Sequence, residues 1–237
     1  MNNEYTLTEG TECMEGLAEP IQCSGAVIKK AEESIQTGDD LAFEGRKKEM
    51  RRYYEEAILL LEKLANEGNA RAQYLLGDVY RFKAEWLPCD STLKRRILDL
   101  YTAAAKQGMP EALIRCAEVK MCGDELDDVE GGLESATKAA RKLRPLAEKG
   151  DADAQYYLSQ CYLIGYSECG ENESLKWCWS AANQGHREAE YGMGCNYDEG
   201  CDMLPCDKDA AVRWWQKAAR QGHLESRREL RARKVSW

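Results

Sequence analysis

The chain has 237 residues, of which 43% are hydrophobic and 32% charged, and its formal net charge is −9 at pH 7. This length is enough to bury a core, and no apolar run, the longest being 57–61, approaches the roughly 18 residues that a membrane-spanning helix needs. The acidic balance argues against a nucleic-acid partner, because phosphate binding needs a basic surface.

The first part of the chain carries most of the negative charge. Residues 1–44 hold ten acids and two lysines, so the other 193 residues carry a net charge of only −1. With Gly10, Gly16 and Pro20 among scattered acids, residues 1–22 predict a loosely ordered leader, either a solvated tail or an acidic arm that docks on a basic partner or on the protein's own groove. The start is polar rather than a signal peptide, so we expect a cytoplasmic protein.

Helices are expected in pairs along residues 23–237. The first, 24–36, ends at 38–40, where a glycine and two aspartates interrupt the helical pattern. The basic run 46–52 is interpreted as a solvated helix face rather than a binding patch, and Pro145 is expected to kink the longest helix. The helices expected after the first are 46–66, 69–83, 91–107, 110–122, 128–149, 152–164, 173–184, 187–199, 208–221 and 223–234.

Five glycines recur every 35 to 42 residues, and each ends the second helix of a pair: Gly68, Gly108, Gly150, Gly185 and Gly222. An alanine stands three positions before each glycine, and eight positions before it stands a large or long residue: Leu60, Leu100, Lys142, Trp177 or Trp214. Positions −11, −8, −4 and −3 share one helical face, so we expect that face to pack on a neighbouring helix. The glycine stops the helix because it adopts the left-handed conformation without a Cβ clash.

A second set of columns follows each glycine, on the first helix of the next pair. The motif Ala-Gln-Tyr begins at Ala72 and Ala154, a variant begins at Ala189, and the copy at 112–120 is degenerate. A small residue follows in each copy and lets two helices approach closely: Gly77, Ala117, Ser159 and Gly194. Two helices in a period of roughly 34 to 47 residues indicate an α-solenoid.

Together these columns resemble the Sel-1-like repeat family, a relative of the tetratricopeptide repeats, over about residues 46–230. The shared plan is A-x-x-W-x-x-K-A-A-x-Q-G-x-x-x-A-x-Y-x-x-G-x-x-Y-x-x-G. The resemblance implies an all-α, right-handed α-solenoid of about five helix-turn-helix repeats, whose first helices line a concave face that binds a partner, with no catalysis. The implied repeats are 23–68, 69–108, 109–150, 151–185 and 186–222, followed by a capping helix within 223–237.

Alignment with the family places sixteen side chains on the concave face. The candidate partner-binding residues are Arg71, Tyr74, Asp78, Arg81, Glu111, Glu118, Asp153, Tyr156, Gln160, Glu188, Tyr191 and Asp198, with Ile114, Met121, Leu163 and Cys195 beside them. The first set holds two arginines and one aspartate, whereas the later sets hold five acids and no base. This predicts a basic or amphipathic partner segment, with the acids setting register and the tyrosines contributing affinity.

Residues that carry catalysis or bind metals are sparse. The two histidines, His186 and His223, each follow a stop glycine in the same column, and no nucleophile, phosphate-loop or paired-carboxylate motif accompanies them. We therefore expect no enzyme, cofactor or metal. The eleven cysteines are interpreted as reduced, buried residues. The alternatives are disulfides in an oxidising compartment, with Cys161 and Cys169 resembling a family spacing, and a zinc site near residues 195–206, although no C-x-x-C motif is present.

The tryptophans have two interpretations. Trp177 and Trp214 are expected in the core, whereas Trp179 and Trp215 lie off its column, at the core rim or as exposed anchors.

The predicted function is a cytoplasmic protein-interaction scaffold, acting as an adaptor or regulator. One alternative is an immunity protein or dedicated chaperone that neutralises a secreted toxin or effector. A second is an exported, disulfide-containing protein that interacts with a host.

Overall fold

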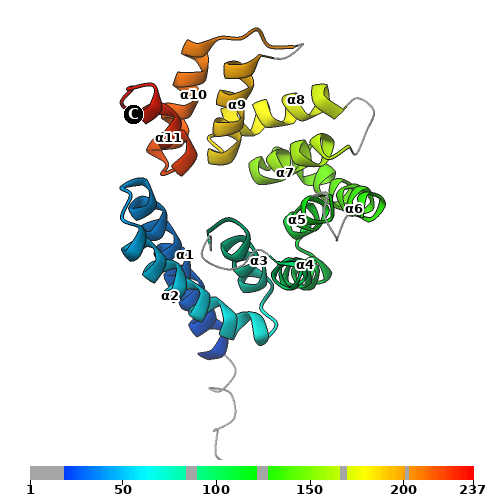
Figure 1. Ribbon diagram of the computed structural model, residues 1–237. Helices are drawn as coiled ribbons and strands as arrows, with labels where there is room; N and C mark the ends of the chain where they lie inside the picture. The colour runs from blue at the N-terminus through cyan, green and yellow to red at the C-terminus, as the bar shows by residue number, and fades with distance from the viewer. Residues whose placement is uncertain (1–18, 84–89, 122–127, 166–169, 201–202) are drawn as a thin grey trace, which may run out of the picture.

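The computed structural model describes residues 19–83, 90–121, 128–165, 170–200 and 203–237, and their secondary structure is helical (Figure 1). The helices are α1 (Glu19–Phe43), α2 (Lys47–Asn66), α3 (Ala70–Asp78) continued by the π-helical turn η1 (Val79–Lys83), α4 (Ser91–Lys106), α5 (Pro110–Lys120), α6 (Val129–Ala147), α7 (Ala152–Leu163), α8 (Gly170–Asn183), α9 (Arg187–Glu199), α10 (Lys208–Arg220) and α11 (Leu224–Ala232). Each helix packs on the one before and the one after it. The α-solenoid predicted from the sequence is confirmed.

The second helices all end in the same way. Each of the five stop glycines has a positive φ, from 84° at Gly185 to 101° at Gly108. The backbone N–H of the residue after the glycine donates to the carbonyl of the residue four positions before the glycine. An example is the bond of 2.9 Å from Asn69 N to Leu64 O. This Schellman pattern satisfies carbonyls that a helix end would otherwise leave without donors.

First helices begin with matching caps. Four of the five side chains that follow a stop glycine accept a hydrogen bond from the backbone N–H three residues on: Asn69 at 3.0 Å, Asp151 at 2.7 Å, His186 at 3.2 Å and His223 at 3.1 Å. Met109, the fifth, makes no such bond. Stop and cap together fix the sharp reversal between consecutive pairs.

The buried face of the second helices differs from the predicted one by one column. The residues seven positions before the stop glycine are all buried: Leu61, Tyr101, Leu143, Cys178 and Trp215. The predicted position −8 is a core column only in part: Trp214 there is buried as expected, and Trp177, Leu60 and Leu100 are partly buried against the core, but Lys142 is exposed. Trp215, expected at the core rim, is 1% exposed. Positions −11, −7, −4 and −3 follow the i, i+4, i+7, i+8 spacing of one helical stripe.

Small residues let the two helices of a pair approach closely, as predicted. A Cβ on Gly77 would lie 2.6 Å from Cε1 of Tyr101, and Ala117 and Ser159 in the same column are fully buried. Gly38 lies equally close to the Tyr54 ring, and α1 continues through it to Phe43. The predicted helix end at 38–40 is therefore wrong, because this glycine serves helix packing.

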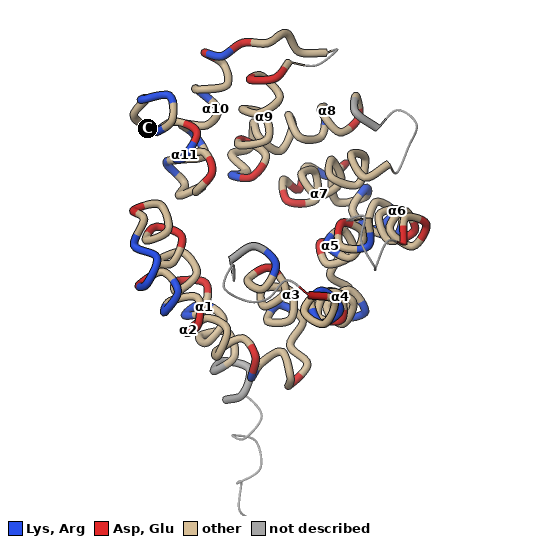
Figure 2. The backbone as a smooth tube through the Cα atoms, in the orientation of Figure 1, with Lys and Arg blue, Asp and Glu red and all other residues tan. Residues whose placement is uncertain are grey.

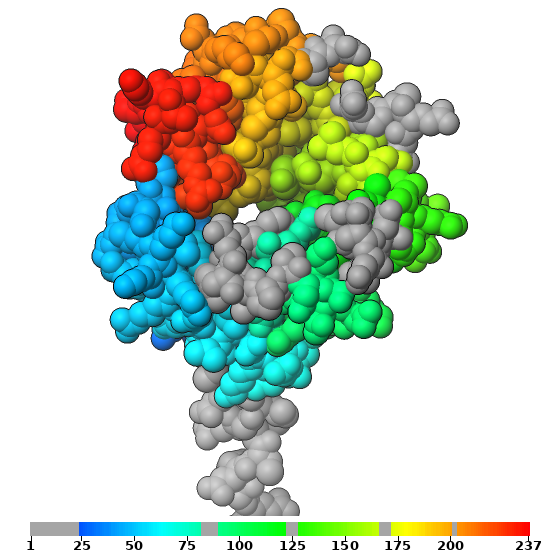
Figure 3. Space-filling model, in the orientation of Figure 1, coloured from blue at the N-terminus to red at the C-terminus, as the bar shows by residue number. Residues whose placement is uncertain are grey.

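The two ends of the solenoid touch and close a ring (Figures 1 and 3). Arg227 Nη1 on α11 lies 2.5 Å from Oδ1 of Asp40 on α1. Arg231 Nη1 donates to the backbone carbonyl of Phe43 at 2.8 Å, and the Arg231 guanidinium lies over the Phe43 ring. Trp237 packs edge-on against the same ring. The last helix, predicted to cap an open stack, thus also joins it to the first.

Within the described residues, no helix is both long enough and apolar enough to cross a membrane.

Candidate functional site

The first helices of the later pairs line the inside of the ring. Figure 1 shows α5 and α7 toward the centre with α6 and α8 outside them, and Figure 2 shows acidic residues on the centre-facing ends of α7 and α9. The twelve candidate partner-binding residues lie on α3, η1, α5, α7 and α9. The structure shows which of them are available and which hold the fold together.

The candidates on α3, η1 and α5 form a network with Arg115. Its Nε lies 3.4 Å from Oδ1 of Asp78, and its Nη1 lies 3.0 Å from Oε2 of Glu118. Arg81 Nη1 is 2.6 Å from the same Glu118 oxygen, and the Tyr101 hydroxyl donates to Asp78 at 2.7 Å. Arg115 follows Ile114, which is one of the aligned concave-face positions, but is not itself one of them. The alignment with the family therefore gave this face no base on α5.

Burial dominates the electrostatics of this network. It raises the pKa of Asp78 above its ordinary value, and the positive charge of Arg115 and the hydroxyls of Tyr101 and Tyr74 oppose the rise. Burial also raises the pKa of Tyr74, which is 4% exposed. These groups stabilise the packing of α3 on its neighbours and offer little charge to a partner.

Two consecutive repeats build the same unit of acid, tyrosine and histidine. The His186 ring stacks on Tyr156 with 4.5 Å between centroids, and its Nε2 lies 3.3 Å from Oδ1 of Asp153. In the next repeat His223 stacks on Tyr191 at 4.4 Å, with Nε2 2.9 Å from Glu188 Oε2. Each histidine caps the following helix with Nδ1 and bridges to the preceding repeat with Nε2.

The Glu188 carboxylate is held in its charged form. Burial alone would raise its pKa, but the hydrogen bond and charge of His223, with the charge of Arg187, prevail and lower the pKa to about 2. Asp198 is likewise paired, with Lys208 at 3.1 Å and Arg233 at 3.1 Å.

The remaining candidates are less constrained. Arg71 pairs with Glu32 of α1 at 2.8 Å, and Glu111 is half-buried. Asp153 keeps 78% of its side chain exposed. Beside them Ile114 is buried, whereas Leu163 is 60% exposed.

A cavity of about 480 Å³ lies between α7, α8 and α9. It brings together four of the candidates: Tyr156, Gln160, Glu188 and Tyr191. Leu163 also lines it, and Asn196 and Glu199 contribute polar groups that the alignment with the family did not include. Glu199 is exposed and forms no ion pair with a described residue. The α7–α9 crevice, as we name this cavity, therefore combines aromatic, apolar, amide and acidic groups.

Five cysteines in the described part of the chain are free thiols: Cys116, Cys161, Cys178, Cys195 and Cys206. Among the described residues, no three His, Cys, Asp or Glu side chains gather as metal ligands. The pairing considered for Cys169, and the cluster that includes Cys201, lie outside the described residues.

The repeated hairpins agree with the family comparison. The Sel1 repeat model matches residues 43–69, 70–83, 152–186 and 187–223. The chain is a Sel1 repeat protein. Sel1 repeat proteins are generally protein-interaction scaffolds. The interval between the matched ranges, 84–151, includes the degenerate motif copy and the buried Arg115 network.

A yeast protein is also similar to part of this chain. The chitin synthase regulator SKT5 of Saccharomyces cerevisiae is 30% identical over 145 residues, which are 58% of this chain and 20% of the yeast protein. The chain thus spans about a fifth of that relative's length.

Two solved structures are similar at low identity. The immunity protein Pa5087 from Pseudomonas aeruginosa is 19% identical with a TM-score of 0.45, covering 73% of this chain and 60% of that one. A Sel1 repeat protein from Oxalobacter formigenes is 20% identical with a TM-score of 0.43, covering 75% and 64%. Scores of this size support no conclusion about function.

Proposed function

We propose that the chain is a non-catalytic scaffold that binds a basic or amphipathic segment of another protein in the α7–α9 crevice. The observation that carries the proposal is the composition of that crevice. The exposed Leu163 offers an apolar contact, Tyr156 and Tyr191 supply flat rings, and Glu199 supplies a charge that no described residue neutralises. Aromatic and apolar groups of this kind typically provide most of the affinity at protein interfaces.

Most of the candidate acids are paired within the chain, which limits the acids that a partner can contact. Asp78, Glu118, Glu188 and Asp198 are each paired with an arginine of the same chain. A partner that used them would have to displace those cations, whereas Glu199 and Asp153 remain accessible. Among the acids that line the crevice, Glu199 is therefore the one proposed to set the register, and Asp153 is a second exposed acid at the start of α7.

The family and the yeast relative agree with a role exercised through a partner. Sel1 repeat proteins generally serve as scaffolds, and the yeast relative is named a regulator of another protein, chitin synthase. The immunity or chaperone role, the exported role and the cytoplasmic location stay predictions.

The test compares wild type with a crevice variant, Leu163→Asp with Glu199→Lys, in affinity purification from the native cell followed by mass spectrometry. The matched control is Leu59→Asp with Glu67→Lys, which changes an exposed leucine and an exposed glutamate on α2 and its C-terminal cap. We expect a protein that wild type and control recover and the crevice variant loses. Equal recovery by all three would contradict the proposal.

A further inference from the structure

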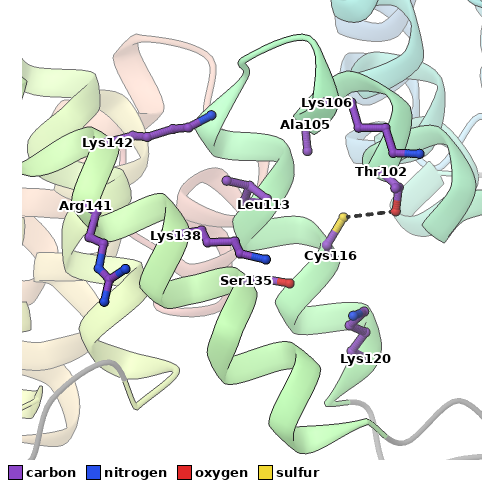
Figure 4. A pocket seen from close by; sticks show the side chains of 10 residues that line it. All are labelled: Thr102, Ala105, Lys106, Leu113, Cys116, Lys120, Ser135, Lys138, Arg141 and Lys142. Carbon is purple, nitrogen blue, oxygen red and sulfur yellow. Dashed lines mark hydrogen bonds between the residues drawn. The ribbon is translucent and has the colours of Figure 1, made fainter.

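A second cavity of about 480 Å³ lies between α4, α5 and α6 (Figure 4). We name it the outer pocket. Its floor is largely apolar, formed by Ala105 of α4 and by Leu113 and Cys116 of α5. Cys116 is 4% exposed, and its Sγ lies 3.7 Å from Oγ1 of Thr102.

Every charged residue that lines the outer pocket is basic: Lys106, Lys120, Lys138, Arg141 and Lys142. Lys120 pairs with Asp128 at 3.1 Å, and Lys138 pairs with Glu134 at 2.7 Å. Lys106, Arg141 and Lys142 are exposed and form no ion pair with a described residue. In a chain of net charge −9, this concentrates positive potential around an apolar floor.

The thiol on the floor does not weaken that potential. Burial raises the pKa of Cys116 above its ordinary value of 9.0, and the Thr102 hydrogen bond and the charge of Lys120 oppose the rise. The thiol therefore stays neutral at pH 7 and acts as a small apolar group.

The basic groups are spread along the pocket instead of converging on one point. Figure 4 shows Lys142 and Lys120 toward opposite ends, with Lys138 between them and Lys106 above Thr102. A single phosphate would need several cations directed at one place. Separate carboxylates along a peptide match the spread arrangement, and an apolar side chain between them matches the floor.

We propose that the outer pocket binds an acidic amphipathic peptide segment of a partner protein. An apolar side chain of the segment rests on Leu113 and Ala105. Carboxylates elsewhere in the segment pair with Lys106, Arg141 and Lys142. Electrostatic complementarity of this kind sets specificity and the association rate. The two cavities share no lining residue, so the scaffold has two separate sites of opposite charge preference.

The test uses a short fluorescein-labelled peptide with glutamates on both sides of two leucines, titrated by fluorescence polarisation. We expect saturable binding that weakens as salt is added, because surface charges are screened. Lys106→Glu with Lys142→Glu is expected to weaken binding at least about tenfold. Lys47→Glu with Lys48→Glu, the same charge change on the exposed start of α2, is expected to leave the affinity within about twofold. A peptide with serines for the leucines is expected to bind more weakly.

A milder pair, Lys106→Gln with Lys142→Gln, provides a second variant, and the melting temperature of each variant checks that it folds. The proposal is overturned if wild type does not bind the peptide, or if both glutamate pairs weaken binding equally. It is also overturned if the peptide binds only after residues 1–18 are removed, which would make the acidic leader the occupant. Binding of phosphatidylserine vesicles in place of the peptide would likewise overturn it and identify a membrane surface.

Discussion

Single glycines decide how closely the two helices of a pair can pack. Gly77 on α3 faces Tyr101 on α4, and Gly194 on α9 faces Trp215 on α10 in the same way. The aromatic ring fills the space that a side chain would need. Tyr101 cannot yield easily, because its hydroxyl is also hydrogen-bonded to Asp78.

Replacing Gly77 by alanine is expected to lower the free energy of unfolding by about 1–3 kcal/mol, because the new Cβ would overlap the Tyr101 ring. Urea denaturation measures the change. The matched control is Gly25→Ala on α1, where nothing lies within 4 Å of an added Cβ. That variant is expected to gain about 0.5–1 kcal/mol, because alanine favours a helix interior. A Gly77 variant as stable as wild type would contradict the proposed close approach.

His186 is expected to make stability depend on pH. Burial lowers its pKa below the ordinary 6.5, and Asp153 and Glu188 oppose this only in part. The unfolded chain therefore takes up a proton at a pH where the folded chain does not. The free energy of unfolding is expected to fall as pH decreases through 6.5. The contribution of His186 to this fall ends below the pKa that His186 has in the folded chain.

Replacing His186 by asparagine tests this, because asparagine is a good N-cap but does not titrate. The melting temperature of the variant is expected to change less than that of wild type between about pH 7 and pH 5. Glu188, with its pKa of about 2 against an ordinary 4.5, loses its contribution only at lower pH and does not interfere. Identical pH profiles for the two proteins would refute the assignment to His186.

At the scale of the helix, a side-chain cap follows four of the five stop glycines and holds the start of the next first helix. Asp151 Oδ1 accepts from Ala154 N at 2.7 Å at the start of α7. Asp151→Ala is expected to cost about 1 kcal/mol in the free energy of unfolding, measured by urea denaturation. Asp151→Asn retains the acceptor and is expected to cost much less. Equal losses would point to the charge of Asp151 and away from the cap.

Sequence periodicity predicted the elements well because their signals are local. Stop glycines and cap residues lie within one turn of the boundaries they set, so most helix ends were predicted within a few residues. Gly38 was misread as a helix end because its role depends on Tyr54, sixteen residues away on the next helix. The large residues at −8 predicted a core column there; Trp214 is buried, but full burial follows position −7, because that position faces the neighbouring helices more directly.

The site was harder to predict than the fold because its charges are paired across elements. Arg115 comes between Asp78 and Glu118, and Arg233 reaches Asp198 from beyond α11. Column alignment places residues on a face but does not show which cations of other helices reach that face. The crevice residue Glu199 had no column signal and emerges only from the packing of α7 on α8 and α9.

At the scale of the whole molecule, the contact between α1 and α11 converts an open superhelix into a ring. Stacked repeats contact only their neighbours, so this closing contact joins residues that are 187 positions apart in the sequence. The Arg227 side chain is only 22% exposed at this contact, which favours a pair stronger than an ordinary surface ion pair.

Asp40→Arg is expected to open the ring, because it places two like charges at the junction, and to increase the radius of gyration measured by small-angle X-ray scattering. Combining it with Arg227→Asp restores opposite charges and is expected to restore the wild-type value. Lys30→Glu, beside Glu56 on the same helix pair, is the control and is expected to leave the radius unchanged. An Asp40 variant as compact as wild type would show that the ion pair does not hold the ring closed.

The most direct test of the proposed scaffold role is hydrogen–deuterium exchange of the whole chain, with and without the partner recovered by affinity purification. The account predicts that the partner slows exchange in residues 156–163 of α7 and 188–199 of α9, which form the crevice. Unchanged exchange in both helices, with protection confined to other parts of the ring, would contradict the assignment of partner binding to the α7–α9 crevice.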